Sequence, residues 1–423
     1  MISYAEAMAE VLQHTGRLSV ESIPLEVAQG RTLAEAVVSR CPIPPVDQAA
    51  VDGYALHCGS KSLPAGSELP LVSIRRLSRG HDPAQLGWAR RIHTNAPMSD
   101  GMDAVLPLEQ GQRLPPDADG NLRLRLKAPL HRGDHVHRQG AEADTGTEIL
   151  PAGEVLDGPR ILLAGTVGAE RLRVVSRPQV AIFSTGHDRH GGLEGYCPGN
   201  SGRDVNGSYL EMMARTVGAE VRMNQPLGQC GDYFQAMLQQ VRDLSLDVII
   251  CTRGEAAPRD EQMMSSLRAL DARILFSKVA VTPGSSLICA QFPGGSLFFG
   301  ISAEPAAMAA ACRFFLMPTL ARMQGRAAER PVLARLAPPL WPAGSRLPGF
   351  RRARLYQHAD GTLWVQIPRS DDPLALQGVR RTNAWAVVPP HAPTWRGETR
   401  LEVYGTLPDM LDIPLERHRS ETG

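Results

Sequence analysis

The sequence predicts a multidomain α/β protein, on three observations. The chain has 423 residues, enough for about three domains of about 150 residues each. Between residues 174 and 325, apolar strand patterns alternate with helix patterns, which is typical of an α/β sheet domain. On either side of that segment, short strands separated by turns indicate two β-rich modules, at about 44–144 and 326–410.

The alternation in the α/β segment predicts a parallel sheet with helices on both of its faces. Strands are expected over 180–183, 220–223, 247–251, 287–290 and 296–300, and helices over 208–217, 232–243, 260–269 and 304–323.

The first module is expected to be inserted into a smaller domain. Amphipathic patterns predict helices over 2–16 and 26–37, and a helix with its connection resumes at 148–169. Insertions are tolerated where chain ends lie close together. We therefore expect the following domains: a discontinuous linker or dimerisation domain (1–43 and 145–173), an inserted β domain (44–144), an α/β domain (174–325), a C-terminal β domain (326–410) and a tail (411–423).

Charge and cysteine usage exclude several classes of protein. The 45 basic and 44 acidic residues give no global field for nucleic acid or an anionic membrane, so neither partner is expected. The N-terminus lacks a signal-peptide pattern, and no apolar run is long enough for a membrane helix. The seven cysteines are scattered and form no Cys-x-x-Cys pair, which indicates a reducing, cytoplasmic compartment. Only three of the basic residues are lysines: Lys61, Lys127 and Lys278.

The most informative stretch is 178–206. An apolar strand pattern ends in Ser184-Thr185-Gly186, and a helix pattern begins after Asp204 and Asn206. In open α/β sheets, ligands bind beyond the carboxyl ends of strands, where helix N-termini attract anions. The alternative is a plain strand-to-helix connection without a ligand.

Three other clusters suit a ligand, and each has a simpler interpretation. Carboxylates near turns suit Mg²⁺ or are solvated turn residues: Asp47, Asp52, Asp103 and Glu109. His135 and His137 suit a metal or are surface histidines. Seven arginines in 326–356 suit phosphate or an acidic partner, although no aromatic residues interleave with them in sequence. Glycine-rich dinucleotide, Walker and hydrolase-elbow motifs are absent from the sequence.

Five segments resemble the MoeA family of molybdopterin molybdenumtransferases. They are Pro-Pro-Val-Asp-Gln-Ala-Ala-Val-Asp-Gly-Tyr-Ala (44–55), Arg-Ile-His-Thr-Asn-Ala-Pro (91–97), Gly-Met-Asp-Ala-Val (101–105), Val-Ala-Ile-Phe-Ser-Thr-Gly (180–186) and Pro-Gly-x4-Asp-Val-Asn (198–206). The resemblance implies an elongated four-domain homodimer with a molybdopterin-binding, MogA-like α/β domain. It also implies insertion of molybdate into adenylylated molybdopterin with Mg²⁺, releasing AMP, in a cleft that two subunits share.

The resemblance assigns roles to individual positions. It implies catalytic Asp52, Asp188 and Lys278, and metal-binding Asp52, Glu142, Asp188 and Asp204. It implies that molybdopterin is bound by Thr94, Arg138, Ser184, Thr185, Gly186, Asn206, Asp232, Gly254 and Pro305.

Several positions depart from the family pattern. The glycine-rich loop Ser-Gly-Gly-Val-Ser-x-Gly reads Arg253-Gly-Glu-Ala-Ala-Pro-Arg259, which we interpret as blocking a glycine-dependent path. Lys-Pro-Gly-Lys-Pro reads Thr282-Pro-Gly-Ser285-Ser, and Leu-Pro-Gly-Asn-Pro reads Ile301-Ser-Ala-Glu304-Pro. The two lost lysines predict a weakened anion site.

Two hypotheses follow from the sequence. The first is a molybdenumtransferase with a divergent site, for which molybdopterin adenylyltransferase and molybdoenzyme-maturation proteins are expected partners. The second is a non-catalytic paralogue that binds or scaffolds partners in the same pathway.

Overall fold

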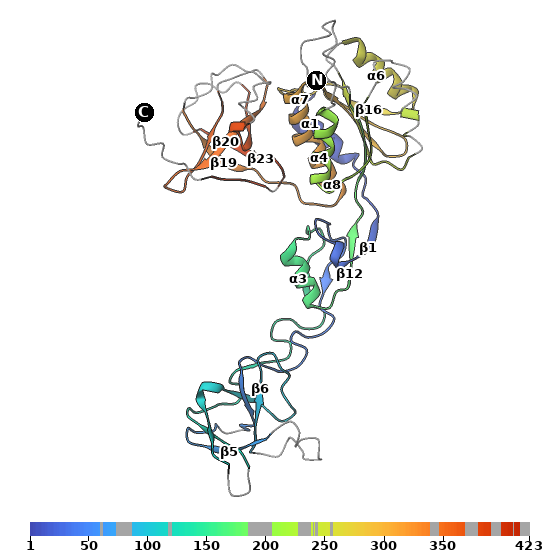
Figure 1. Cartoon of the computed structure of the whole chain (residues 1–423). Coiled ribbons are helices and arrows are strands. Elements are labelled where there is room, and N and C mark those ends of the chain that lie inside the picture. The colour runs from blue at the N-terminus through green and yellow to red at the C-terminus, as the bar shows by residue number, and fades with distance from the viewer. Residues whose placement is uncertain are drawn as a thin grey trace, which may run out of the picture.

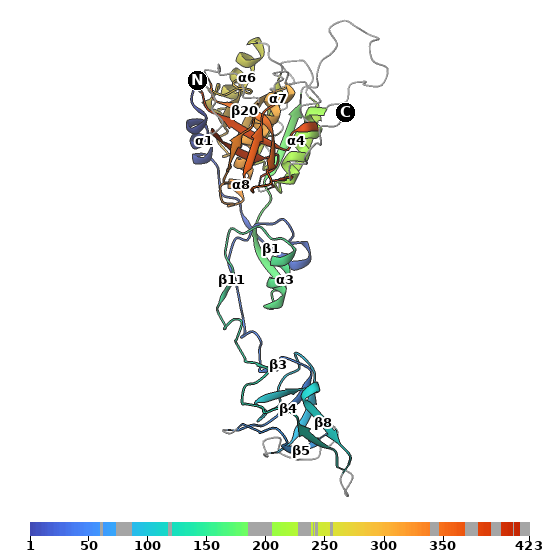
Figure 2. The ribbon, with the colours of Figure 1, turned by 90° about the vertical axis from the view of Figure 1, so that its left-hand side faces the viewer.

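The computed structural model shows an elongated chain with three regions along its length (Figures 1 and 2). A β-rich unit occupies one end, a small unit containing α3 (Gly158–Thr166) lies in the middle, and an α/β unit and a β-barrel lie side by side at the other end. The structure describes residues 1–59, 62–72, 87–116, 121–184, 205–226, 238, 239, 241, 244–253, 257–338, 347–368, 380–390, 399–408 and 410–414, without the side chains of 257–260.

The middle unit is held together by two antiparallel pairings. β1 (Val20–Pro24) pairs with β12 (Arg171–Val175), and β2 (Val37–Val38) pairs with β11 (Glu148–Leu150). The predicted helix over 26–37 is wrong, because only the short 3₁₀ turn η1 (Leu25–Val27) forms there. Gly30, at φ +73°, turns the chain so that Leu33 forms a bridge to Val174 instead of a helical turn.

The inserted unit is a six-stranded sheet in the order β7-β4-β6-β5-β9-β8. Its elements are β4 (Gly53–Leu56), β5 (Glu68–Val72), β6 (Ala89–Ile92), β7 (Ala104–Pro107), η2 (Leu108–Gln110), β8 (Gly111–Leu114) and β9 (Arg123–Leu126). Beside them, β3 (Gln48–Ala49) pairs with β10 (Val136–His137). Leu56, Leu106 and Leu124 are fully buried in its core, as expected for a compact β module.

The α/β unit contains a six-stranded sheet in the order β14-β13-β15-β18-β17-β16. The strands are β13 (Gln179–Ser184), β14 (Glu220–Pro226), β15 (Val248–Arg253), β16 (Arg273–Phe276), β17 (Ile288–Gln291) and β18 (Leu297–Ser302). The first four in that order are parallel, as predicted, but β17 pairs antiparallel with both β18 and β16. The expectation of a wholly parallel sheet is wrong because β17 and β18 form a hairpin without a crossover helix.

Helices cover both faces of this sheet, as predicted (Figure 2). On one face lie α1 (Tyr4–Gln13), α4 (Val205–Thr216), α7 (Pro305–Ala311), the π-helical segment η3 (Cys312–Leu316) and α8 (Met317–Met323). On the other face lies α6 (Ala257–Ala269), which contributes the buried Met263 and Leu267. Most of the predicted helix 232–243 lies outside the described residues. Among the described helices, none has the length and apolar character needed to cross a membrane.

The C-terminal unit is a closed barrel in the order β19-β21-β20-β22-β23. Its strands are β19 (Val332–Leu336), β20 (Gly349–Gln357), β21 (Leu363–Gln366), β22 (Ala384–Val388) and β23 (Arg400–Gly405). Alternate side chains fill the interior, among them Leu336, Leu355 and Val365. Closure removes the unpaired edges that an open sheet would expose.

A buried junction joins the barrel to the α/β unit. The rings of Phe314 and Phe350 stack at 3.9 Å between centroids, and Tyr4 meets both edge-on. Beside them the Arg313 guanidinium, which is 1% exposed, donates two hydrogen bonds to Glu329 at 2.6 and 2.7 Å and one to the Gly405 carbonyl at 2.9 Å. The carboxylate therefore neutralises a charge that would otherwise be buried alone.

We predict that Glu329→Gln lowers the free energy of unfolding by about 3 to 5 kcal/mol, because it leaves the Arg313 charge buried without its counter-ion. Urea unfolding followed by tryptophan fluorescence measures this, since Trp385 lies in the same cluster. Glu35→Gln is the control, because it breaks an exposed ion pair with Arg173 and should leave the unfolding midpoint nearly unchanged. Equal effects of the two substitutions would contradict a stabilising role for the buried pair.

Candidate functional site

The inserted unit presents a carboxylate held in one orientation. Asp52 follows β3, and its Oδ1 accepts hydrogen bonds from the backbone amide and hydroxyl of Thr94 at 2.7 and 2.9 Å. These bonds to Thr94 lower the pKa of Asp52, and the side chain is 53% exposed. Asp52 is therefore an ionised, oriented carboxylate that faces solvent, and Thr94, which the resemblance assigned to molybdopterin, is its hydrogen-bond partner.

The other predicted residues of the inserted unit lie near its β3–β10 pairing. Arg138 donates to Asp47 at 2.6 Å, and the Gln139 amide donates to the same carboxylate at 2.8 Å. Glu142 is exposed on the chain that leads back to the middle unit. Asp47 is thus a structural partner that positions Arg138.

Asp103 and the pair His135 and His137, which the sequence suggested as metal ligands, do not form a metal site among the described residues. The Asp103 carboxylate is buried and accepts from the amides of Cys58 and Gly59, so it shapes a turn. His135 lies in a turn at φ +53°, so the expected pair of histidines on one strand does not form. Within the described ranges, no three His, Cys, Asp or Glu side chains gather closely enough to hold a metal ion.

A second group of predicted residues lies in the α/β unit. Ser184 is the buried last residue of β13, and Pro305 is the first residue of α7, directly beyond β18. Asn206, in the first turn of α4, donates to the carbonyl of Ala303 at 3.1 Å. These contacts bring the carboxyl ends of β13 and β18 together with two helix N-termini, the place where α/β sheets bind ligands.

The loop 282–286, in which the family pattern has lysines at positions 282 and 285, lies where the α/β unit meets the barrel. The Thr282 amide donates to Pro348, and its carbonyl accepts from Phe350 at 2.9 Å. Lys278 precedes this loop and is exposed, while its carbonyl accepts from Ile2. The loop is therefore fixed by backbone pairing to the start of β20.

Arg253 reaches this loop from the end of β15. Its side chain is 3% exposed, and its guanidinium donates to the carbonyl of Ser286. The guanidinium thus lies next to the loop that contains Thr282 and Ser285. Sequence reasoning treated position 253 only as an obstruction in the neighbouring loop.

Glu304 occupies the N-terminus of α7. Its carboxylate accepts from the amides of Ala306 and Ala307 at 2.9 and 2.6 Å. The family pattern has asparagine here, and the sequence comparison recorded Glu304 only as a departure. Because the carboxylate takes both amides, this helix end is capped from within the chain.

Arg352 is one of the seven arginines of 326–356, and it was not predicted to lie beside the α/β unit. It lies on β20 with its guanidinium 4.7 Å from the centre of the Trp385 ring, and burial lowers its pKa. Tyr209 on α4 is close enough to influence the pKa of Arg352, which places Arg352 on the side of the barrel that faces the α/β unit. Only the alternation along β20, with Phe350 in the junction, would have indicated this orientation.

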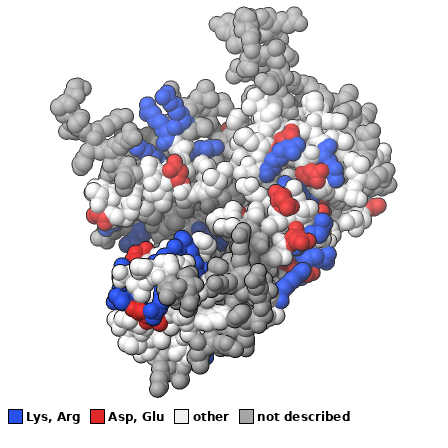
Figure 3. All heavy atoms as spheres, turned by 60° about the horizontal axis from the view of Figure 1, so that its bottom comes forward, with Lys and Arg blue, Asp and Glu red and all other residues white. Residues whose placement is uncertain are grey.

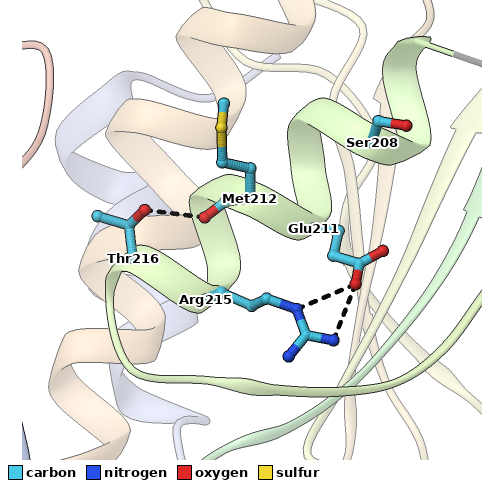
Figure 4. A pocket seen from close by; sticks show the side chains of 5 residues that line it. All are labelled: Ser208, Glu211, Met212, Arg215 and Thr216. Carbon is cyan, nitrogen blue, oxygen red and sulfur yellow. Dashed lines mark hydrogen bonds and ion pairs between the residues drawn. The ribbon is translucent and has the colours of Figure 1, made fainter.

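The remaining assigned positions lie outside the described residues: Thr185, Gly186, Asp188, Asp204, Asp232 and Gly254. A separate cavity of about 600 Å³ lies on the outer face of α4, lined by Ser208, Glu211, Met212, Arg215 and Thr216 (Figure 4). The Glu211–Arg215 ion pair crosses it, and no assigned residue lines it.

The two groups of predicted residues are far apart within one chain. Asp52, Thr94, Arg138 and Glu142 belong to the inserted unit at one end of the molecule, and Ser184, Asn206, Lys278 and Pro305 to the α/β unit at the other (Figures 1 and 2). The structure therefore brings together the members of each group, but not the two groups.

Comparisons with known proteins cover both groups. A family model described as the MoeA N-terminal region, domains I and II, matches residues 2–168, and one described as a probable molybdopterin binding domain matches 145–322. Molybdopterin molybdenumtransferases of Synechococcus elongatus and Staphylococcus aureus are both 26% identical. The first aligns over 92% of this chain and 96% of its own length, the second over 77% and 76%.

Solved structures show the same fold. The molybdopterin biosynthesis MoeA protein of Pyrococcus horikoshii superposes with a TM-score of 0.73 at 21% identity, covering 95% of this chain and 99% of its own. A molybdenum cofactor biosynthesis protein of Pyrococcus furiosus gives 0.56 at 17% identity, covering 95% and 98%. With two family models that together span residues 2–322 and relatives aligned over nearly the whole length, the chain belongs to the MoeA family.

Proposed function

We propose that this protein is a molybdopterin molybdenumtransferase, which inserts molybdate into adenylylated molybdopterin and releases AMP during molybdenum cofactor biosynthesis. The observation that carries the proposal is the alignment with a transferase of that name over 410 residues, which spans both groups of site residues. The scaffold alternative is not favoured, because the relatives that match over this length have the name of the enzyme.

The inserted unit fits one half of a magnesium site. Asp52 is ionised and exposed, with Oδ1 held by Thr94, so its carboxylate is ready to bind a hard cation. We propose that Asp52 and Glu142 of one chain and Asp188 and Asp204 of a second chain hold Mg²⁺. When bound, Mg²⁺ would neutralise the charge of the substrate's phosphate groups.

We propose that Arg253 and Arg352 supply the positive charge that binds molybdate. Arg253 is anchored on Ser286 beside the loop where the family has lysines, and Arg352 approaches from β20, whose first residues pair with Thr282. Guanidinium groups bind oxyanions through several donors. Arg253 thus replaces, from another strand, the charge that positions 282 and 285 lack.

The purified protein is expected to release AMP from adenylylated molybdopterin only when molybdate and Mg²⁺ are both present. Asp52→Asn should reduce the rate by about 100-fold or more, because it removes a ligand charge at the phosphates. Asp100→Asn is the control for this unit, since it removes an exposed carboxylate that belongs to neither group of site residues. Molybdate-independent release, or an Asp52→Asn variant as active as the parent, would overturn the proposal.

Charge replacement at the molybdate site gives a sharper prediction. Arg253→Gln should raise the molybdate concentration needed for half-maximal AMP release by about tenfold or more. Adding Ser285→Lys to that variant should restore much of the loss, because the charge returns from the family position. Arg268→Gln, on the same unit, is the matched control. If Ser285→Lys improves the parent protein as much as the Arg253→Gln variant, Arg253 does not supply the missing charge.

We also propose a homodimer, because one chain holds the two groups of site residues at opposite ends. The middle unit, which contains β1, β2, β11, β12 and α3, suits the interface, whereas α1 of the expected domain 1–43 packs on the α/β sheet. The middle unit exposes apolar side chains on its strands and on α3, where Leu162 is 72% exposed. A two-fold dimer through this unit would set the inserted unit of each chain beside the α/β unit of the other.

Light scattering is expected to give a dimer mass at micromolar concentration, and Leu162→Glu should shift the protein toward the monomer by placing a charge in an apolar interface. Met212→Glu, which alters a similarly exposed apolar side chain on α4, should leave the mass unchanged.

A second test of the shared site is complementation between two variants. At a molybdate concentration too low for the Arg253→Gln variant, mixing Asp52→Asn with Arg253→Gln chains should recover activity, and no recovery in confirmed mixed dimers would contradict a shared site.

A cytoplasmic location is part of the proposal, supported by the reduced state of Cys41, Cys58, Cys251, Cys289 and Cys312, all of which are free thiols. In that compartment the adenylyltransferase that makes the substrate is the expected supplier.

A further inference from the structure

The barrel carries a row of arginine and aromatic side chains that strand pairing assembles. Arg335 on β19 is paired with Arg400 on β23 and with Trp364 on β21. Trp364 is in turn paired with Tyr356 on β20. The row Arg400–Arg335–Trp364–Tyr356 therefore crosses four neighbouring strands, and Arg354 lies two residues before Tyr356 on the same face.

The row faces outward. Each of its residues alternates with residues of the barrel core, among them Leu336, Leu355 and Val365. Arg335 stacks on Trp364 at 5.6 Å and Arg354 on Tyr356 at 5.8 Å, measured to the ring centres. Figure 3 shows a group of basic side chains on the barrel, at the upper left of the view, with an acidic side chain beside it. Stacking holds the guanidinium groups in place at low entropic cost for binding.

No described carboxylate neutralises the arginines of this row. In the part of the chain that the structure describes, Arg335, Arg354 and Arg400 form no ion pair with a carboxylate. Arg335 and Arg400 also face each other directly across two strands, an arrangement that destabilises a sheet. The only acidic residue beside the row on the described strands is Glu402, which is paired with Leu333.

We propose that this row is a docking surface for an extended acidic segment of a partner protein. Trp, Tyr and Arg are the residue types that dominate binding energy at protein interfaces, and the uncompensated arginines select carboxylates. Four strands span about 14 Å, which matches about four residues of an extended peptide. Single-stranded nucleic acid fits less well, because its binding sites on barrels cover about 4 to 16 nucleotides and need a longer track.

The inference does not depend on the transferase proposal, because the row lies on strand faces away from the barrel core and includes none of the site residues. It also offers a binding partner for arginines of the segment 326–356, whose aromatic neighbours are not visible in the order of the sequence. The aromatic residues interleave with the arginines in space, although Arg335 and Trp364 are 29 positions apart.

Fluorescence anisotropy of the full-length protein with fluorescein-labelled hexaglutamate tests the inference. Saturable binding is expected, weakening as salt rises. Arg335→Gln should weaken it about tenfold, and Arg335→Gln with Arg400→Gln should weaken it further. Arg113→Gln is the matched control, because Arg113 also stacks on a tyrosine, in the inserted unit, and should leave binding unchanged.

Trp364→Phe separates stacking from fold stability. It keeps an aromatic ring, so the melting temperature should hold, while affinity for hexaglutamate falls only modestly compared with Arg335→Gln. Tighter, Trp364-dependent binding of labelled oligothymidine of six nucleotides would overturn the choice of a protein partner. Equal loss in the Arg113→Gln and Arg335→Gln variants, or no hexaglutamate binding at low salt, would overturn the docking surface itself.

Discussion

The antiparallel pairing of β1 with β12 is the constraint on which the rest of the architecture depends. Five residues on each strand, Val20–Pro24 and Arg171–Val175, fix the point where the chain leaves toward the inserted unit and the point where it returns. The residues between these two strands, which include the inserted unit, therefore extend away from the α/β unit. The consequence is chemical as well as geometric, because the oriented carboxylate of Asp52 is held far from the sheet edge where Asn206 and Pro305 lie.

At the other end of the molecule, the α/β unit and the barrel are joined by a buried junction instead of being held apart. The barrel is attached through Phe350, Arg313 and the paired backbone of Thr282, so the loop that contains Thr282 is joined by backbone hydrogen bonds to the start of β20. Arg352 is therefore as rigidly placed relative to Arg253 as if both belonged to one domain. A site that needs several fixed cations gains from such rigidity, since preorganised charges cost no rearrangement when the anion arrives.

Sequence reasoning predicted what depends on local patterns. Five of the six strands of the α/β unit, all but β16, and α4 were placed within a few residues, because apolar periodicity and helix-forming residues agree there. The helix over 26–37 failed because pairing with β12 outweighed an amphipathic pattern. The antiparallel pair β17–β18 and the arginine–aromatic row depend on registers that a linear reading does not contain. Asp52 and Thr94 were identified together only because the family resemblance linked them.

The replaced lysines show why the physical environment decides how charge is conserved. The chain has 42 arginines and 3 lysines, counted within the 45 basic residues, yet positions 282 and 285 did not become arginine. Arg253 is only 3% exposed. A lysine at this position would tend to lose its proton, because burial lowers the pKa of the lysine ammonium group. Arginine keeps its charge under the same conditions and accepts a fixed anchor, the carbonyl of Ser286. If Arg253 serves the proposed molybdate site, positive charge stays beside this loop although it comes from another position in the sequence.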